Sequence, residues 1–222
     1  MSVVLRAVDV GIGYHGRDAL LTGCDLEVEA GSVVGLAGPS GCGKSTLLRV
    51  LGGLQQPSHG SVVAGPDRRP IVEFRRSRPG ILGLVGQDPV SSLDPLWSVA
   101  RIIEEAVPAS ERSRDRVREA LARVGLTELD PRTRPGALSI GQCQRVALAR
   151  ALANSPLAVL ADEPTSALDP TNAANVVRLL RTAADAGSAV VVSSHDGPLL
   201  NSLCDIVFTW VDGRLSPQVS SD

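Results

Sequence analysis

One stretch of the sequence has the residue types and spacing needed to hold a chain of phosphates. Residues 38–46 fit the pattern G-x-x-x-x-G-K-[ST], in which glycines let the backbone curl so that successive N–H groups face one anion. The hydroxyl of Ser45 is of the kind that binds Mg²⁺. The residues predicted to contact the phosphates are Gly38, Pro39, Ser40, Gly41, Cys42, Gly43, Lys44, Ser45 and Thr46.

Lys44 strengthens this interpretation because it is the only lysine in the chain, where every other basic side chain of the Lys+Arg set is arginine. A compact ammonium on a thin stem fits between phosphate oxygens, whereas a planar guanidinium does not. The apolar run 33–37 before the loop predicts a buried strand, and 47–51 predicts the start of a helix. Strand, loop and helix are the context that this motif requires, against the alternative of an ordinary glycine-rich turn.

Length and composition favour one domain, or one domain with a subdomain, in a reducing compartment. The chain has 222 residues, a hydrophobic fraction of 43% and a net charge of −2, which argues against nucleic acid as a bulk partner. No apolar run approaches the length of roughly 20 residues that spans a bilayer, and the N-terminus does not resemble a signal peptide. The cysteines have no metal-site or disulfide spacing; they are Cys24, Cys42, Cys143 and Cys204.

Alternating and apolar runs predict strands that alternate with helices. A capping Asp169, then Pro170, and a later Gly187 predict one helix between them. The arginine-rich stretch 68–79 is expected to be an exposed loop, and Asp212-Gly213 a hairpin turn. The strands are expected at 3–10, 25–29, 33–37, 61–64, 81–85, 157–161, 189–192, 208–210 and 214–215.

The texture changes between Pro95 and Asn154, where helical spacing replaces β-branched runs. We therefore predict an α/β fold whose core is a mostly parallel sheet with helices on both faces. An antiparallel β portion is expected near the N-terminus, and an all-helical insert is expected between Pro95 and Asn154.

Two adjacent carboxylates follow the apolar strand 157–161, where α/β sheets bind their ligands. Asp162 is predicted to hold Mg²⁺ through water. Glu163 is predicted to accept the proton of a water that attacks the γ-phosphate. The alternative is an ordinary surface strand end.

Three further side chains are candidates because of where they stand. His195 follows the strand that ends at Ser193, so it is predicted to hydrogen-bond the γ-phosphate or orient the water. Gln87 follows the strand 81–85 and is predicted to reach both Mg²⁺ and the attacking water. Tyr14, the only tyrosine, offers a ring that stacks on adenine; the alternative is a packed core aromatic.

The stretch 138–142, Leu-Ser-Ile-Gly-Gln, precedes a helical run. Ser139 and Gln142 have the spacing of a capping box, and a capped helix N-terminus is also an anion site. Within one chain this helix belongs to the insert, away from residues 38–46. A second copy of the chain would bring it onto the γ-phosphate held by the first.

Together these residues resemble the ATP-binding-cassette (ABC) family over essentially the whole chain. The resemblance implies a P-loop NTPase core at 1–87 and 155–222 and a helical subdomain at 88–154. It implies two molecules of ATP with Mg²⁺, sandwiched in a head-to-tail dimer, and nucleotide contacts from Ser139, Gly141 and Gln142. The matching motifs are Tyr14 (A-loop), 38–46 (Walker A), Gln87 (Q-loop), 138–142 (signature), Asp162-Glu163 (Walker B and catalytic glutamate), 166–169 with Asp169 (D-loop) and His195 (H-loop).

A narrower resemblance lies in residues 87–95, which look like the Q-loop segment of ATPases from peptide and nickel importers. It implies transmembrane permease subunits, a substrate-binding protein acting through them, and a place on the cytoplasmic face of the cell membrane. Residues 88–110 are expected to contact the permease. Many of those ATPases carry a C-terminal extension beyond the position of the hairpin expected at 208–215, and this sequence is not expected to include one.

Two departures from the family pattern matter. Ile140 replaces the first glycine of the signature, and Cys143 stands where the family usually has a basic residue. We expect the branched side chain to crowd the γ-phosphate and weaken this site, so that the natural dimer pairs this chain with a different ATPase.

Two other functions are compatible with the phosphate loop. One is a soluble ABC ATPase with a mechanical role in repair, translation or iron–sulfur assembly, although the chain has neither the coiled coil, the zinc site nor the second cassette of such proteins. The other is a different P-loop enzyme such as a kinase, which the stretch 138–142 argues against.

Overall fold

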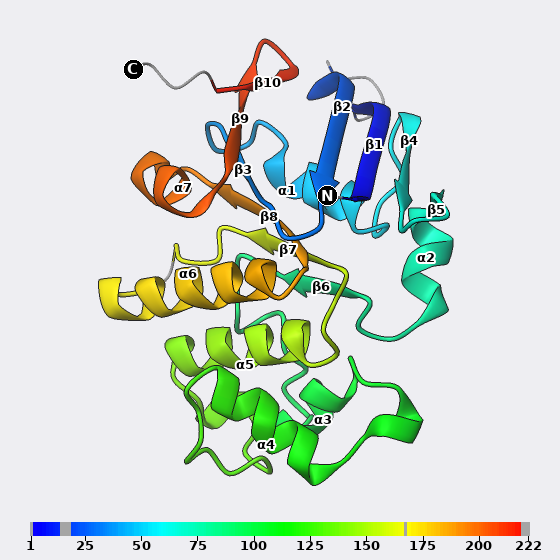
Figure 1. Cartoon of the computed structure of the whole chain (residues 1–222). Coiled ribbons are helices and arrows are strands. Elements are labelled where there is room, and N and C mark those ends of the chain that lie inside the picture. The colour runs from blue at the N-terminus through cyan, green and yellow to red at the C-terminus, as the bar shows by residue number, and fades with distance from the viewer. Residues whose placement is uncertain (1, 14–18, 167, 219–222) are drawn as a thin grey trace.

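The computed structural model describes residues 2–13, 19–166 and 168–218, which form two β-sheets and seven α-helices (Figure 1). The described strands of the larger sheet are ordered β10-β9-β3-β8-β7-β6, and those of the smaller sheet β2-β1-β4-β5. The larger sheet contains β3 (Val33–Ala37), β6 (Leu82–Val85), β7 (Ala158–Asp162), β8 (Ala189–Ser194), β9 (Ile206–Val211) and β10 (Arg214–Pro217). The smaller sheet contains β1 (Val3–Ile12), β2 (Leu21–Glu29), β4 (His59–Ala64) and β5 (Arg69–Pro70).

The larger sheet is parallel from β9 to β6, and only its edge strand β10 is antiparallel. Strand β8 is buried along its whole length and supplies both faces of the sheet. Val190 and Val192 join one hydrophobic cluster, whereas Ala189 and Val191 join the other, as the two-residue period of a strand requires. The predicted parallel core with two covered faces is therefore confirmed.

Helices cover the two faces unequally. Helix α1 (Lys44–Leu51) contacts β7, β8 and β1, so it lies between the two sheets. On the other face, α5 (Ile140–Leu152) contacts β6, while α6 (Pro170–Asp185) and α7 (Gly197–Leu203) contact β8. Asp169 caps α6 through its carboxylate, as the sequence predicts, by accepting from the N–H groups of Thr171 and Asn172.

Residues 86–157, all of which the structure describes, contain helices and no strand. Helices α3 (Val99–Glu104) and α4 (Arg114–Arg123) pack on α5, together with short 3₁₀ turns at Ala109–Glu111 and Pro135–Ala137. Figure 1 shows α3 and α4 at one end of the molecule, beyond α5. The absence of strands from this stretch agrees with the all-helical insert that the sequence predicts. The subdomain boundaries at 88 and 154 stay a prediction.

The expectation of a loop at 68–79 is wrong, because this stretch contains β5 and the helix α2 (Ile71–Ser77). Ile71 and Phe74 lie three residues apart and are both buried, which gives a short helix an apolar face. Arginines dominate the composition of the stretch and obscure this spacing. Arg75 and Arg76 lie in the last turn, where the helix dipole favours positive charge.

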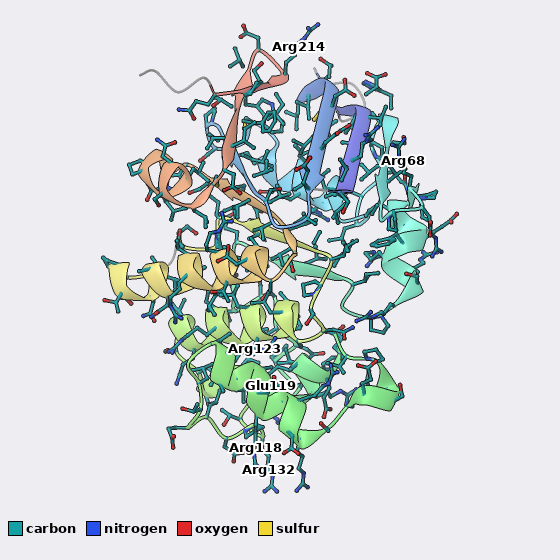
Figure 2. The ribbon with its side chains drawn as sticks, viewed as in Figure 1. Arg68, Arg118, Glu119, Arg123, Arg132 and Arg214 are labelled. Carbon is teal, nitrogen blue, oxygen red and sulfur yellow. The ribbon has the colours of Figure 1, made fainter. Side chains whose placement is uncertain are left out.

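The exposed arginines are spread over the molecule. Figure 2 shows Arg214 on β10 at one end and Arg118 and Arg132 at the other, while Arg68 lies beside β5.

No helix among the described residues combines the length and the apolar character needed to cross a membrane.

Candidate functional site

The phosphate-loop residues 38–43 connect β3 to α1 along a tightly curled path. Gly41 has φ 81° and Gly43 has φ 116°, values that favour glycine. A β-carbon on Gly38 would lie 2.9 Å from Sγ of Cys42, so a larger residue at this position would force the Cys42 side chain to shift. Gly43 caps α1 without a side-chain hydrogen bond, which leaves the positive end of the helix to a ligand.

The ammonium of Lys44 lies inside this loop. Its Nζ donates to the carbonyl oxygen of Gly38 at 2.8 Å and to that of Pro39 at 3.2 Å. The residue is only 6% exposed. The same Nζ lies 3.8 Å from Oε1 of Glu163, so the cation and the predicted proton acceptor face each other.

The register of the parallel strands brings the other candidates to the same edge. Ala37, which precedes the loop, pairs with Ser194, and Ser193 pairs with Asp162. Val85, two residues before Gln87, pairs with Ala161. The carboxyl ends of β3, β8, β7 and β6 therefore lie together, as expected of a ligand-binding edge.

Glu163 occupies an unusual backbone conformation directly after β7. Its φ is 45°, in the left-handed region that non-glycine residues rarely adopt. Its N–H donates to both the carbonyl oxygen and the hydroxyl of Ser193, each at 3.1 Å. The residue is 8% exposed, so its carboxylate is largely shielded from water.

His195 directly follows β8 and contacts the same carboxylate. Its Nδ1 lies 2.9 Å from Oε2 of Glu163. The imidazole side chain is 63% exposed, whereas the glutamate side chain is 9% exposed. Glu163 thus lies between the ammonium of Lys44 and the ring of His195, and this triad of side chains is the centre of the candidate site.

Not every predicted residue joins this centre. Gln87 is exposed, and none of the hydrogen bonds among the described residues links its side chain to Asp162 or Glu163. Ser45 is exposed in the first turn of α1, and Thr46 is half-buried. Tyr14 lies outside the described residues.

The oxygen donors at this edge suit a Mg²⁺ ion that binds together with nucleotide better than they suit a metal ion bound by protein side chains alone. Ser45, Asp162 and Gln87 offer a hydroxyl, a carboxylate and an amide oxygen. The described residues include no group of three or more His, Cys, Asp or Glu side chains that could hold a metal ion. Mg²⁺ typically takes one or two protein oxygens and completes its shell with water and phosphate, so the donor set fits that ion.

The residues 138–142 start α5 as predicted. Ser139 accepts from the N–H of Gln142 at 3.2 Å, and Oε1 of Gln142 accepts from the N–H of Ser139 at 2.8 Å. This capping box is the ordinary structural role of the pair. Ile140 is 54% exposed at the helix start, whereas Cys143 is buried.

The start of α5 lies beside the start of α6. A β-carbon on Gly141 would lie 3.4 Å from Nδ2 of Asn172, which in turn donates to the carboxylate of Asp169. Hydrogen bonds from Asn172 hold the pKa of Asp169 below its usual value. Asp169 therefore acts first as a helix cap, and its predicted contact with nucleotide stays a prediction.

Sequence reasoning missed two buried polar residues at the site. Ser193 donates to Oδ1 of Asp162 at 2.6 Å, and Gln144 donates to the carbonyl oxygen of Pro164 at 2.8 Å. The available signal was a polar side chain within an apolar pattern. Ser193 directly follows the valine run of β8, and Gln144 lies on the buried face of α5.

The fold is that of an ABC ATPase domain, and comparison with known proteins agrees. The ABC transporter family model matches residues 21–166. The chain belongs to the ABC transporter family, which confirms the resemblance inferred from its motifs.

Individual relatives and solved structures extend the match. An ABC transporter ATP-binding protein of Mycobacterium tuberculosis is 42% identical over 195 residues, 84% of this chain and 58% of that protein. A probable D,D-dipeptide transport ATP-binding protein of Escherichia coli is 38% identical over 201 residues, 88% of this chain and 62% of that protein. The dimeric structure of an ATP-binding cassette bound to ADP and Pi is 30% identical with a TM-score of 0.80, covering 98% of this chain and 99% of that one. The chain thus spans about three fifths of the length of the curated relatives.

Proposed function

We propose that this chain binds Mg-ATP and hydrolyses it to energise a membrane transporter, an importer of peptides, nickel or a related small solute. The observation that carries the proposal is the placement of the Glu163 carboxylate, 2.9 Å from His195 and 3.8 Å from Lys44, at the edge where the phosphate loop begins. A buried carboxylate flanked by a phosphate-binding lysine and a histidine suits a general base for water.

The chain's own residues divide the work of hydrolysis. Backbone N–H groups of 38–43 and the ammonium of Lys44 hold the β- and γ-phosphates. Ser45, Asp162 and Gln87 would hold Mg²⁺, which when bound neutralises charge on the phosphates. Glu163 accepts a proton from the water as the water oxygen bonds to the γ-phosphorus. The bond between the γ-phosphorus and the oxygen that bridges it to the β-phosphate breaks, leaving ADP and phosphate. His195 orients that water or the γ-phosphate.

A second ATPase subunit would complete the site. Ser139, Gly141 and Gln142 lie at the capped start of α5, and no hydrogen bond or ion pair among the described residues joins them to the phosphate loop. In a head-to-tail dimer this helix end faces the γ-phosphate held by the other subunit, while Tyr14 stacks on adenine. Because Ile140 adds bulk at this end, we favour a dimer with a different ATPase.

The transport role is supported by the relatives and by the surface. One relative is named as a dipeptide transport ATP-binding protein, in agreement with the resemblance of residues 87–95 to importer ATPases. Within residues 88–110, where we expect the permease contact, Val90 is 49% exposed and Leu96 is 75% exposed, which leaves apolar surface for transmembrane permease subunits. Such a subunit would place the chain on the cytoplasmic face of the membrane, with a substrate-binding protein acting through the permease.

Two experiments test the proposal. Amine acylation should label only the N-terminus and Lys44, and Mg-ATP should protect Lys44; equal labelling with and without nucleotide would contradict the site. An affinity pull-down from detergent-solubilised native membranes should recover multi-span permeases and a second ATPase. Recovery of only ribosomal, DNA-associated or iron–sulfur assembly partners would instead favour a soluble ABC ATPase.

A further inference from the structure

Ser193 lies inside the candidate site without being one of its predicted residues. It is the last residue but one of β8, it pairs with Asp162 across the sheet, and it is 0% exposed. The four preceding residues of the strand are Ala189 and three valines. A hydroxyl buried in such a position is costly unless it is hydrogen-bonded, so its partners indicate its role.

The hydroxyl has two partners, and both belong to the predicted chemistry. It donates to Oδ1 of Asp162 at 2.6 Å and accepts from the N–H of Glu163 at 3.1 Å. A backbone N–H only donates, so the single hydroxyl proton is directed to the Asp162 carboxylate. One atom of β8 thereby links the side chain of Asp162 to the backbone of Glu163.

These bonds act on each carboxylate differently. No other hydrogen bond or ion pair of the Asp162 carboxylate occurs in the part of the chain that the structure describes, so Oδ2 keeps its capacity for a metal-bound water. Glu163 is held at φ 45° by an N–H shared between the hydroxyl and the carbonyl oxygen of Ser193. The hydroxyl therefore sets the rotation of one carboxylate and steadies the strained backbone of the other.

We propose that Ser193 is a positioning residue that orients Asp162 toward Mg²⁺ and Glu163 toward the attacking water. This inference rests on the proposed function, because it assigns Ser193 a role in the same hydrolysis. Loss of the hydroxyl leaves Oδ1 of Asp162 without its donor and frees the carboxylate to rotate. The Mg²⁺ concentration required for half-maximal hydrolysis then rises, while the phosphate loop still holds the nucleotide.

The test compares Ser193→Thr with Ser193→Val, because threonine and valine have nearly the same size and differ in the hydroxyl. Ser188→Ala is the matched control: Ser188 is a buried serine just before β8, and its hydroxyl donates to the carbonyl oxygen of Pro156 at 2.7 Å, away from the site. Each protein is assayed for hydrolysis across Mg²⁺ concentrations. A second readout is the affinity for a non-hydrolysable ATP analogue, with Mg²⁺ and with EDTA.

We expect Ser193→Val to need about tenfold more Mg²⁺ for half-maximal hydrolysis, in line with the loss of a hydrogen bond to a charged group. Its affinity in EDTA should equal that of Ser193→Thr, whereas its gain in affinity on adding Mg²⁺ should be smaller. Thermal unfolding of the two variants shows whether both fold, and Ser188→Ala should keep the wild-type Mg²⁺ dependence.

The outcomes separate the two proposals. If the wild-type chain hydrolyses ATP and the threonine and valine variants share one Mg²⁺ dependence in both readouts, the role of Ser193 is overturned while the proposed function stands. If the wild-type chain binds the analogue without hydrolysing ATP, the proposed function fails, and the Mg²⁺-dependent gain in affinity still decides the role of Ser193. A wild-type chain that binds no nucleotide overturns both.

Discussion

The ring of His195 contacts the carboxylate of Glu163, with Nδ1 2.9 Å from Oε2, and is far more exposed to solvent than that carboxylate. The two residues follow adjacent parallel strands, β8 and β7, whose ends are aligned by the pairing of Ser193 with Asp162. The other carboxylate oxygen faces Lys44 at 3.8 Å. A carboxylate with only 8% of its residue exposed thus has a cation on one side and an imidazole on the other.

Replacing Glu163 with Gln should separate binding from hydrolysis. The amide keeps the size of the side chain but cannot accept the proton of the attacking water, so turnover should fall about 100-fold or more. Binding of ATP should persist because the phosphate loop is unchanged. Turnover and equilibrium nucleotide binding are measured on the same preparation, with the exposed Glu128→Gln as the matched control. Normal turnover in Glu163→Gln would remove Glu163 from the proposed role.

The four cysteines should react with thiol reagents in a defined order. Burial raises the pKa of Cys24 to about 11 and that of Cys204 to about 12, and it also raises the pKa of Cys143. A thiol whose pKa is raised holds little of the reactive thiolate near neutral pH, and its fraction grows only as the pH approaches that pKa. Half-buried Cys42, in the phosphate loop, should therefore react first with maleimide at about pH 7.5.

Modification of Cys42 should inhibit nucleotide binding, and bound Mg-ATP should slow the modification. Peptide mass spectrometry over a time course identifies the order, and Cys42→Ser should lack the fast phase. Labelling of Cys24 or Cys204 at the rate of Cys42 would contradict the order of reactivity that their raised pKa values predict.

The grouping of the candidate residues at one edge could be predicted because these residues follow strands that the sequence identifies. Apolar runs locate β3, β7 and β8, and parallel pairing brings whatever follows them to one edge. The sequence therefore predicts that Lys44, Glu163 and His195 lie together, and the structure has them in contact. The capping box at 139–142 was also predicted, because helix caps depend on residues three apart.

The features that the sequence did not predict depend on long-range contacts or on irregular backbone. The hydroxyl of Ser193 bonds a carboxylate 31 residues away, and Gln144 bonds a carbonyl 20 residues away. Strand β2 begins at Leu21, whereas the sequence predicts a start at residue 25. Its first residues do not alternate regularly between polar and apolar, because Gly23 has φ 58° and the pairing with β1 is irregular there. Helix α2 was missed because only Ile71 and Phe74 reveal its buried face.

Gln144 should couple α5 to the segment that follows Glu163. Its Nε2 donates to the carbonyl oxygen of Pro164 at 2.8 Å, and the residue is 2% exposed. Gln144→Met keeps most of the volume but removes the donor, so it should lower the free energy of unfolding by about 1–3 kcal/mol. Denaturant unfolding measures this, with the exposed Gln56→Met as the matched control. An unchanged free energy of unfolding would mean that another group satisfies the Pro164 carbonyl.

Ile140 should limit how well this chain pairs with itself. Its side chain is 54% exposed at the first position of α5, beside the capped N-terminus that would face the γ-phosphate of another subunit. Ile140→Gly should therefore strengthen ATP-dependent self-association, which light scattering in the Glu163→Gln background measures by holding ATP unhydrolysed.

A glycine at this position also costs the helix about 0.5–1 kcal/mol relative to alanine, so Ile140→Ala serves as the second variant. Alanine removes the branched bulk while it keeps the helix, and both variants should dimerise at lower protein concentration than the chain with isoleucine. If the purified wild-type chain hydrolyses ATP cooperatively by itself and neither substitution changes its dimerisation, then Ile140 does not weaken the signature and a heterodimer need not be invoked.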